Sequence, residues 1–131
     1  MRRSIQLPGI THKAPIPAGS LVGNLLVSSG IGGKDPETGA YPDDVASQVR
    51  FAFGNVRALV EAAGGGVEDI AKVTVFLRDR DDRRHVDEEW LRMFPDEASR
   101  PARHALPLGR EGKALIQLEV IAVIGGDGGP T

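Results

Sequence analysis

The chain has 131 residues, of which 40% are hydrophobic and 26% are charged, a composition typical of a globular domain with a buried core and not of a disordered or fibrous chain. Its 16 basic and 18 acidic residues leave a formal net charge of -2, so binding to nucleic acid, which needs a surplus of positive charge, is not expected. There is no cysteine, which excludes disulfides, thiolate zinc sites and cysteine nucleophiles.

The N-terminal residues do not have the pattern of a signal peptide. Positions 1–9 begin with basic residues but contain no continuous apolar stretch. No apolar run in the chain approaches the roughly 20 residues that a membrane span requires. We therefore expect a cytoplasmic protein that does not cross a membrane.

Strand signals appear first at residues 20–29, where β-forming residues flank Gly23 and Asn24. This pattern predicts two short strands joined by a turn. The glycines, prolines and aspartate of residues 30–41 predict a long loop.

A helix is expected to begin near Pro42, which suits a first helical position, and to end at the glycines 64–66. Apolar residues recur between them at helical spacing, at Val45, Val49, Val56 and Ala63. Residues 70–78 predict a strand with one buried face. Residues 81–94 predict a second amphipathic helix, on which we interpret the charges at 81–84 as a solvated face.

Two further strands are expected at 102–106 and 114–124. In the last one, apolar residues occupy both alternating faces, interrupted on one of them by Gln117 and Glu119. We infer a single α+β domain over residues 1–131, a mixed sheet with two helices packed on one face, and a loose tail at 125–131. The apolar second face indicates a subunit interface and therefore a homo-oligomer.

The chain offers few candidates for metal or nucleophilic chemistry. His12, His85 and His104 lack the spacing of a metal site, so we expect neither a metal nor another cofactor. The Gly-rich residues 30–35 lack the spacing of a phosphate-binding loop, and Ser28 and Ser29 lack the surroundings of a nucleophilic serine. Both serines remain candidates for hydrogen bonds to a ligand.

Arg103 is a sharper candidate, because it interrupts an otherwise apolar short strand, where a guanidinium group needs an anion. The anion is either a carboxylate of the same chain, in a structural salt bridge, or the carboxylate of a ligand. An arginine can hold a carboxylate through two parallel hydrogen bonds, which gives orientation as well as affinity.

Several short motifs in one order resemble the RidA/YjgF family of reactive intermediate deaminases. They are residues 23–30, 35–39, 60–64, 73–77, 101–103 and 119–123, and the resemblance covers residues 12–123. It implies a chorismate-mutase-like fold, a homotrimer, and clefts between subunits where enamines or imines of 2-keto acids are hydrolysed to the keto acid and ammonia. A small substrate with a carboxylate is the partner implied.

The resemblance also assigns roles to individual residues. It implies that Arg103 binds the substrate carboxylate and that Ser29 and Gly30 line the cleft. Three further cleft positions depart from the family pattern: Ile16 replaces a tyrosine, Asp87 an asparagine and Ala105 a cysteine. If Asp87 points at Arg103, it competes with a ligand carboxylate for the same guanidinium.

Gln117 is the largest departure, because the family has at this position the glutamate that orients the attacking water. A glutamine can hold water but cannot exchange a proton near neutral pH. This difference predicts a slow or different activity. The leading hypothesis is a deaminase in which Arg103 and Gln117 act on a 2-imino acid such as 2-aminoacrylate. The alternatives are a trimeric sensor that binds 2-keto acids without turnover and, last, an endoribonuclease, for which we identify neither a phosphate-binding surface nor a general base.

Overall fold

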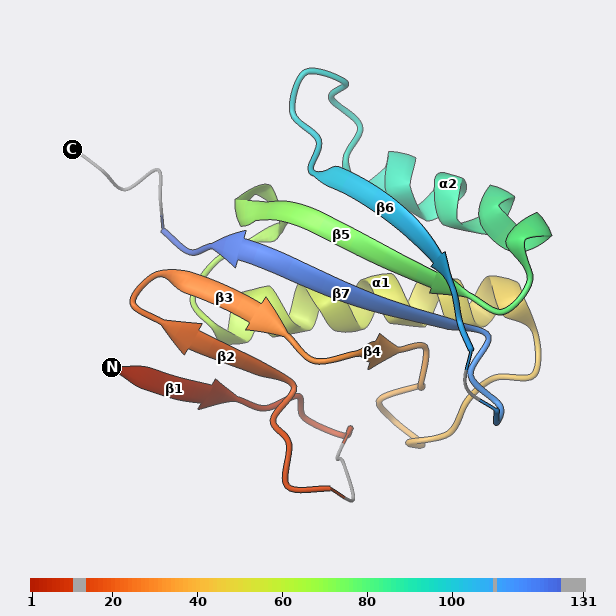
Figure 1. Ribbon diagram of the computed structural model, residues 1–131, viewed down its shortest axis with the longest axis horizontal. Coiled ribbons are helices and arrows are strands. Elements are labelled where there is room, and N and C mark those ends of the chain that lie inside the picture. Colours follow the sequence, from red (N-terminus) through yellow and green to blue (C-terminus); the bar gives the residue numbers. More distant parts are fainter. Residues whose placement is uncertain (11–13, 110, 126–131) are drawn as a thin grey trace.

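The computed structural model describes residues 1–10, 14–109 and 111–125 as one mixed sheet with two α-helices (Figure 1). The elements follow one another as β1 (Arg2–Ile5), β2 (Gly19–Val22), β3 (Leu25–Ser28), β4 (Ile31–Gly32), α1 (Val45–Ala62), β5 (Ile70–Leu77), α2 (Arg83–Met93), β6 (Ala102–Pro107) and β7 (Ile116–Val123). The strand order is β1-β2-β3-β7-β5-β6, and β4 also pairs with β7. Strands β5 and β6 are parallel and the other pairs are antiparallel. The α+β class and the mixed sheet expected from the sequence are confirmed.

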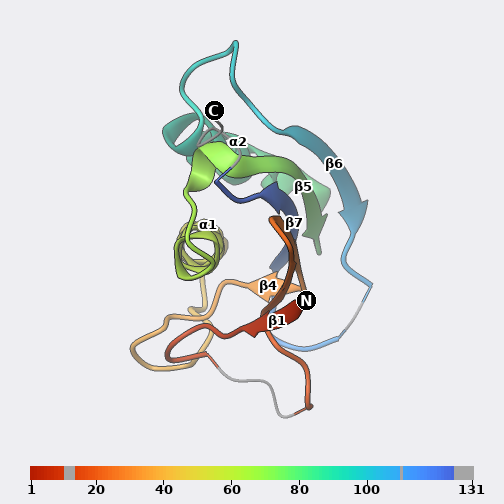
Figure 2. The ribbon, with the colours of Figure 1, turned by 90° about the vertical axis from the view of Figure 1, so that its left-hand side faces the viewer.

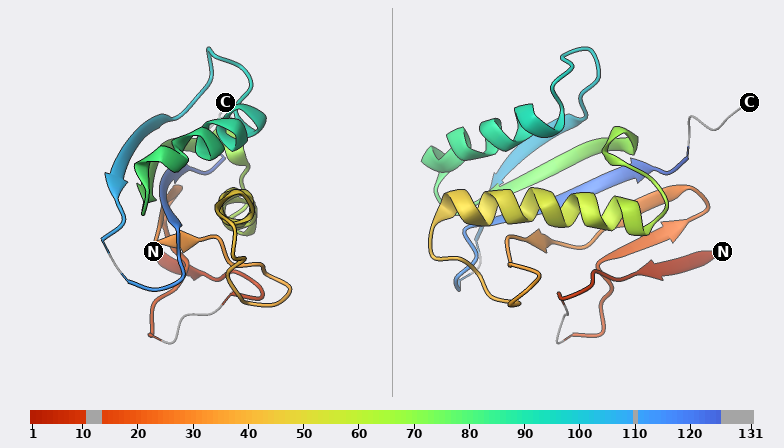
Figure 3. Two further views of the ribbon diagram at one scale, coloured as in Figure 1. Left: turned by 90° about the vertical axis from the view of Figure 1, so that its right-hand side faces the viewer. Right: turned by 180° about the vertical axis from the view of Figure 1, so that it is seen from behind.

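Both helices lie on the same face of the sheet, as expected (Figures 2 and 3). The core between the two layers includes apolar side chains from α1, α2 and alternate positions of β5 and β7, among them Leu59, Val75, Trp90 and Leu118, and the other strands add further apolar residues. Each large side chain removed from water contributes about 1.5–3 kcal/mol to folding. Among the described residues, no helix combines the length and apolar character needed to cross a membrane.

Helix α1 begins three residues later than the sequence suggested. Its N-cap is Asp44, whose carboxylate accepts a hydrogen bond of 2.9 Å from the backbone N–H of Ser47. Hydrogen bonds from the Ser47 side chain and backbone lower the pKa of Asp44. Pro42 therefore lies before the helix, because this cap fixes the first turn. The C-terminal end is confirmed: Ala63 is the C-cap, and Gly64 follows with a φ of 95°.

The two strands expected at residues 20–29 are confirmed as β2 and β3, but two other strands were missed. In β1 only Ile5 is buried, so its sequence lacks the alternation by which strands are recognised. It forms by pairing with β2, in a register that places Arg3 opposite Leu21. Strand β4 has only two residues, and it is a strand because these residues pair with β7.

The second expected helix is confirmed over residues 83–93, but residues 80–82 form a separate 3-10 turn in front of it. The side chain of Asp79 accepts a hydrogen bond from the backbone N–H of Asp81 and so caps this turn. The loose tail expected at residues 125–131 lies, apart from Gly125, outside the described residues.

The sheet face opposite the helices exposes a group of apolar side chains. Strand β7 alternates as expected: its even-numbered positions 116–122 are buried, whereas Ile121 and Val123 are exposed. The register of β2, β3, β5, β6 and β7 places further exposed apolar residues on this face. The group, called the open-face cluster below, consists of Val22, Leu25, Val27, Leu106, Ile121 and Val123, each 39% to 50% exposed.

Candidate functional site

Arg103 lies on β6, the edge strand of the sheet, on the side that faces the helices. The parallel register pairs Arg103 with Val73 and Ala105 with Val75, and both valines are buried under the helix layer. Side chains in register on neighbouring strands point to the same face. Arg103 and Ala105 therefore point toward α2.

Helix α2 supplies the two residues that hold the Arg103 guanidinium. Its Nη2 donates a hydrogen bond of 2.7 Å to Oδ1 of Asp87, and its central carbon lies 4.9 Å from the ring centroid of Trp90. Asp87 and Trp90 are three positions apart, so they lie on one face of the helix. We call Arg103, Asp87 and Trp90 the arginine cluster.

The ion pair of the arginine cluster is partly open to solvent. The Arg103 side chain is 23% exposed and that of Asp87 is 49% exposed, and pairs in such surroundings contribute at most about 1 kcal/mol. Within the described residues, the contact joins one guanidinium nitrogen to one carboxylate oxygen. It is therefore not a bidentate salt bridge, in which an arginine donates two parallel hydrogen bonds to one carboxylate.

A second group of candidate residues surrounds Gly30. A Cβ atom placed on Gly30 would lie 2.4 Å from the side-chain Cδ and Nε2 of Gln117, so the glutamine packs directly on the glycine backbone. The pairing of Gly32 with Gln117 brings these segments together. Only a residue without a side chain allows this approach. We call Gly30 and Gln117 the glutamine cluster.

The two candidate serines have structural partners. The Ser29 hydroxyl donates a hydrogen bond of 2.7 Å to the carbonyl oxygen of Pro17, and the Ser28 hydroxyl accepts one of 2.8 Å from the backbone N–H of Val120. Ser29 thereby fixes the segment next to Ile16, which is 51% exposed. The Ser29 oxygen can still accept a hydrogen bond from a ligand.

The two clusters lie on opposite faces of the sheet. Gln117 is paired across the sheet with Phe76, whereas Arg103 is paired with Val73. Because residues 73 and 76 are an odd number of positions apart on β5, their side chains point to opposite faces. One chain therefore does not bring Arg103 and Gln117 to a common point, and a site that uses both needs a second copy of the chain.

His104 lies on the sheet face opposite the helices, so it points away from Arg103, and its side chain is exposed. His12 lies outside the described residues. In the part of the chain that the structure describes, no three or more His, Asp or Glu side chains gather as metal ligands would.

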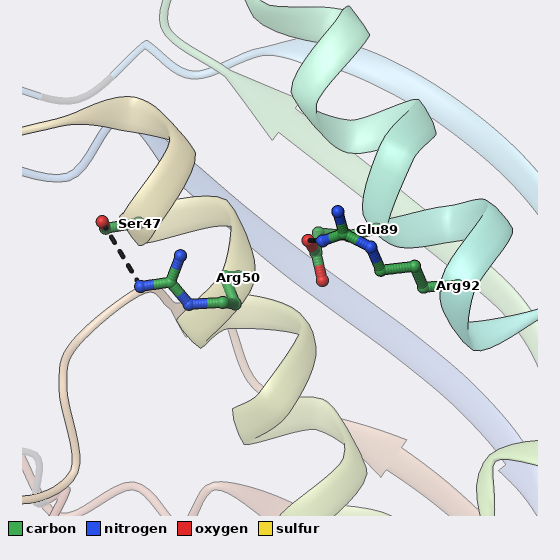
Figure 4. Close-up of polar contacts among 4 residues, drawn as sticks. All are labelled: Ser47, Arg50, Glu89 and Arg92. Carbon is green, nitrogen blue, oxygen red and sulfur yellow. Dashed lines mark hydrogen bonds and ion pairs between the residues drawn. The ribbon is translucent and has the colours of Figure 1, made fainter.

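Polar contacts along the outer surfaces of the helices are local. Figure 4 shows Arg50 donating to the Ser47 hydroxyl on α1 and Arg92 paired with Glu89 on α2. Both pairs are three positions apart, the usual spacing of contacts within one helix. They stabilise the helices and do not form part of either cluster.

Sequence reasoning missed two features of the site. Trp90 was assigned no role from the sequence, and its ring lies beneath the Arg103 guanidinium. A cavity of about 510 Å³ beside Ala105 was not expected either; it is lined by Leu77, Arg78, Arg80, Asp81, Arg83, Ala105, Leu106 and Pro107. Its only signal in the sequence is the density of arginines at residues 78–84.

Comparison with known proteins shows a family and several relatives that the chain resembles. Residues 13–124 match the model of a family described as Endoribonuclease L-PSP. The 2-iminobutanoate/2-iminopropanoate deaminase of Escherichia coli K12 is 40% identical over 120 residues, covering 86% of this chain and 94% of the relative.

Solved structures show the same fold. The crystal structure of the YjgF gene product from E. coli superimposes with a TM-score of 0.83 and 35% identity, covering 92% of this chain and 98% of that one. The structure of E. coli TdcF with bound serine has the same TM-score and coverage at 31% identity.

Proposed function

The chain belongs to the Endoribonuclease L-PSP family, which includes the RidA/YjgF proteins, and we propose that it hydrolyses small 2-imino acids such as the imine form of 2-aminoacrylate. In this reaction the imine and one water molecule give a 2-keto acid and ammonia. The relatives named as deaminases support the reaction class. The residues of this chain support the way in which the substrate is held.

Arg103 is the observation that carries the proposal. Its guanidinium is held in place over Trp90 and is partly exposed, and the contact to Asp87 uses a single nitrogen. A substrate carboxylate that displaces Asp87 gains two parallel hydrogen bonds in its place. Fixing the carboxylate in this way orients the imine carbon and raises its effective concentration at the reacting groups.

The glutamine cluster provides the other half of the proposed site. The Gln117 amide positions the attacking water by hydrogen bonds, and the backbone at Gly30 and the oxygen of Ser29 contact the substrate. Water adds to the imine carbon, and the resulting aminoalcohol releases ammonia to leave the ketone. Because glutamine cannot take up the proton of the water, solvent or the departing nitrogen accepts it, and turnover is slow.

The site requires more than one copy of the chain, and the assembly proposed is the homotrimer that the family resemblance implies, in which the arginine cluster of one copy faces the glutamine cluster of the next. Two observations support this assembly: the clusters lie on opposite faces of one sheet, and the open-face cluster leaves apolar side chains in water. Burial of such a surface against a second copy is the usual way to remove it from solvent.

The test is to generate 2-aminoacrylate in situ and to follow pyruvate formation by wild type, Arg103→Ala and the control Arg84→Ala. Arg84 is exposed on α2 and belongs to neither cluster. We expect wild type and Arg84→Ala to accelerate pyruvate formation equally and Arg103→Ala to lose at least about tenfold, since hydrogen bonds to charged groups contribute about 1.5–3 kcal/mol. Equal rates for wild type and Arg103→Ala would reject the mechanism.

A second function, binding of 2-keto acids without turnover, is favoured by Gln117, because this residue lacks the proton-exchanging group of a carboxylate. Calorimetry distinguishes the two functions. Binding of 2-ketobutyrate that Arg103→Ala abolishes, together with no acceleration of imine hydrolysis by wild type, would establish the sensor.

A further inference from the structure

The cavity next to Ala105 has a positive lining. Its volume is about 510 Å³, and the ionisable residues around it are Arg78, Arg80, Asp81 and Arg83. Three arginines and one aspartate leave two formal positive charges on the wall. Like charges that line one concave surface raise the local concentration of anions there.

Arg80 and Arg83 are available to a ligand. In the described part of the chain, neither has a carboxylate within ion-pair distance. The nearby Asp79 is engaged instead in capping the 3-10 turn through the N–H of Asp81. Arg78 has a structural role as well, since its Nε donates a hydrogen bond of 3.0 Å to the carbonyl oxygen of Ala114.

The cavity lies next to Arg103 along β6. Ala105 follows Arg103 by two residues on β6, so both side chains point to the same face, about 7 Å apart along the strand. Ala105 lines the cavity, so the cavity begins two residues along β6 from Arg103. A ligand that has its first carboxylate on Arg103 and runs along β6 past Ala105 brings its far end to the cavity with Arg80 and Arg83.

We infer that the preferred substrates are dianionic: 2-imino acids whose far end carries a second carboxylate, which Arg80 and Arg83 bind. This inference rests on the proposed function, because it assigns the first carboxylate to Arg103. It adds a specificity determinant that neither the reaction nor the arginine cluster requires.

The experiment compares two five-carbon 2-keto acids, 2-oxoglutarate and 2-oxopentanoate, which differ in having a carboxylate or a methyl group at the far end. Calorimetry measures the Kd of both for wild type, for the double variant Arg80→Gln/Arg83→Gln and for the control Arg84→Gln. Arg84 follows Arg83 on α2 and is exposed, but it does not line the cavity. Each variant carries only surface substitutions, and circular dichroism verifies its fold.

Wild type and the control are expected to bind 2-oxoglutarate at least about tenfold more tightly than 2-oxopentanoate, because charge-assisted hydrogen bonds contribute roughly 1.5–3 kcal/mol. The double variant is expected to lose this preference while its affinity for 2-oxopentanoate stays the same. Equal binding of both acids by wild type would overturn the inference and leave the proposed function standing. Failure of wild type to bind either acid would overturn the proposed function and the inference together.

Discussion

Asp87 and Arg103, 16 positions apart in the chain, form an ion pair in which the Nη2 and Oδ1 atoms lie 2.7 Å apart. The Asp87 carboxylate accepts a hydrogen bond from the Arg103 guanidinium, the group that we propose binds the substrate. Any carboxylate ligand must therefore compete with a carboxylate that the chain itself provides. The free energy needed to break the Asp87–Arg103 ion pair is small, because both side chains are partly exposed.

Replacing Asp87 with asparagine should increase ligand affinity. The Asp87→Asn variant keeps the size of the side chain but removes its charge, so Arg103 no longer has to leave an ion pair. We expect the Kd of 2-ketobutyrate to fall by up to about fivefold, which corresponds to about 1 kcal/mol. Calorimetry measures it, and Glu88→Gln, a neighbouring change of the same charge on the exposed side of α2, should have no effect.

Gln117→Glu should increase the rate of imine hydrolysis. The substitution has almost the same shape, so it fits against Gly30, and it introduces a carboxylate that can take a proton from water. General base assistance is typically worth about 10² to 10⁴ in rate, and we expect kcat to rise on the order of 10². Glu119→Gln, two residues further on the same face of β7, is the control. An unchanged kcat in Gln117→Glu would show that this residue does not contact the attacking water.

Gly30→Ala should reduce turnover with little effect on stability. The new methyl group would lie 2.4 Å from the Gln117 side chain. The glutamine can relieve this clash by rotating, but its amide then no longer lies where it is proposed to position the attacking water. Gly54→Ala is the matched control: Gly54 is exposed on α1, and a Cβ there meets nothing within 4 Å. We expect Gly54→Ala to keep full activity and to gain about 0.5–1 kcal/mol in unfolding free energy. Activity of Gly30→Ala equal to wild type would remove Gln117 from the proposed mechanism.

Ile121→Asp should dissociate the proposed trimer and abolish activity. Ile121 belongs to the open-face cluster and is 41% exposed, and a charge buried between subunits without a partner is strongly unfavourable. Light scattering after size exclusion measures the mass. Leu91→Asp, at a residue of α2 that is 53% exposed, should leave mass and activity unchanged. A wild type of monomeric mass that still catalyses the reaction would contradict a site shared between chains.

The sequence predicted those elements whose pattern is local. Helix α1 and strands β5 and β7 follow from the spacing of apolar residues, because each buries one regular face against the core. The strands β1 and β4 were missed because they depend on partners elsewhere in the chain and have little pattern of their own. The candidate residue Arg103 was also visible, because a charged side chain in an apolar strand requires an anion.

The sequence alone determined the fold class, the family and the residues whose side chains can bind a ligand or take part in a reaction, since periodicity and residue type are properties of short segments. Only the tertiary structure decided that Asp87 is the anion paired with Arg103, that Trp90 carries the guanidinium, and that Arg103 and Gln117 point away from each other. These relationships depend on the register between strands and on how α2 packs on the sheet. Both are set by contacts between residues far apart in the chain, which no local pattern encodes.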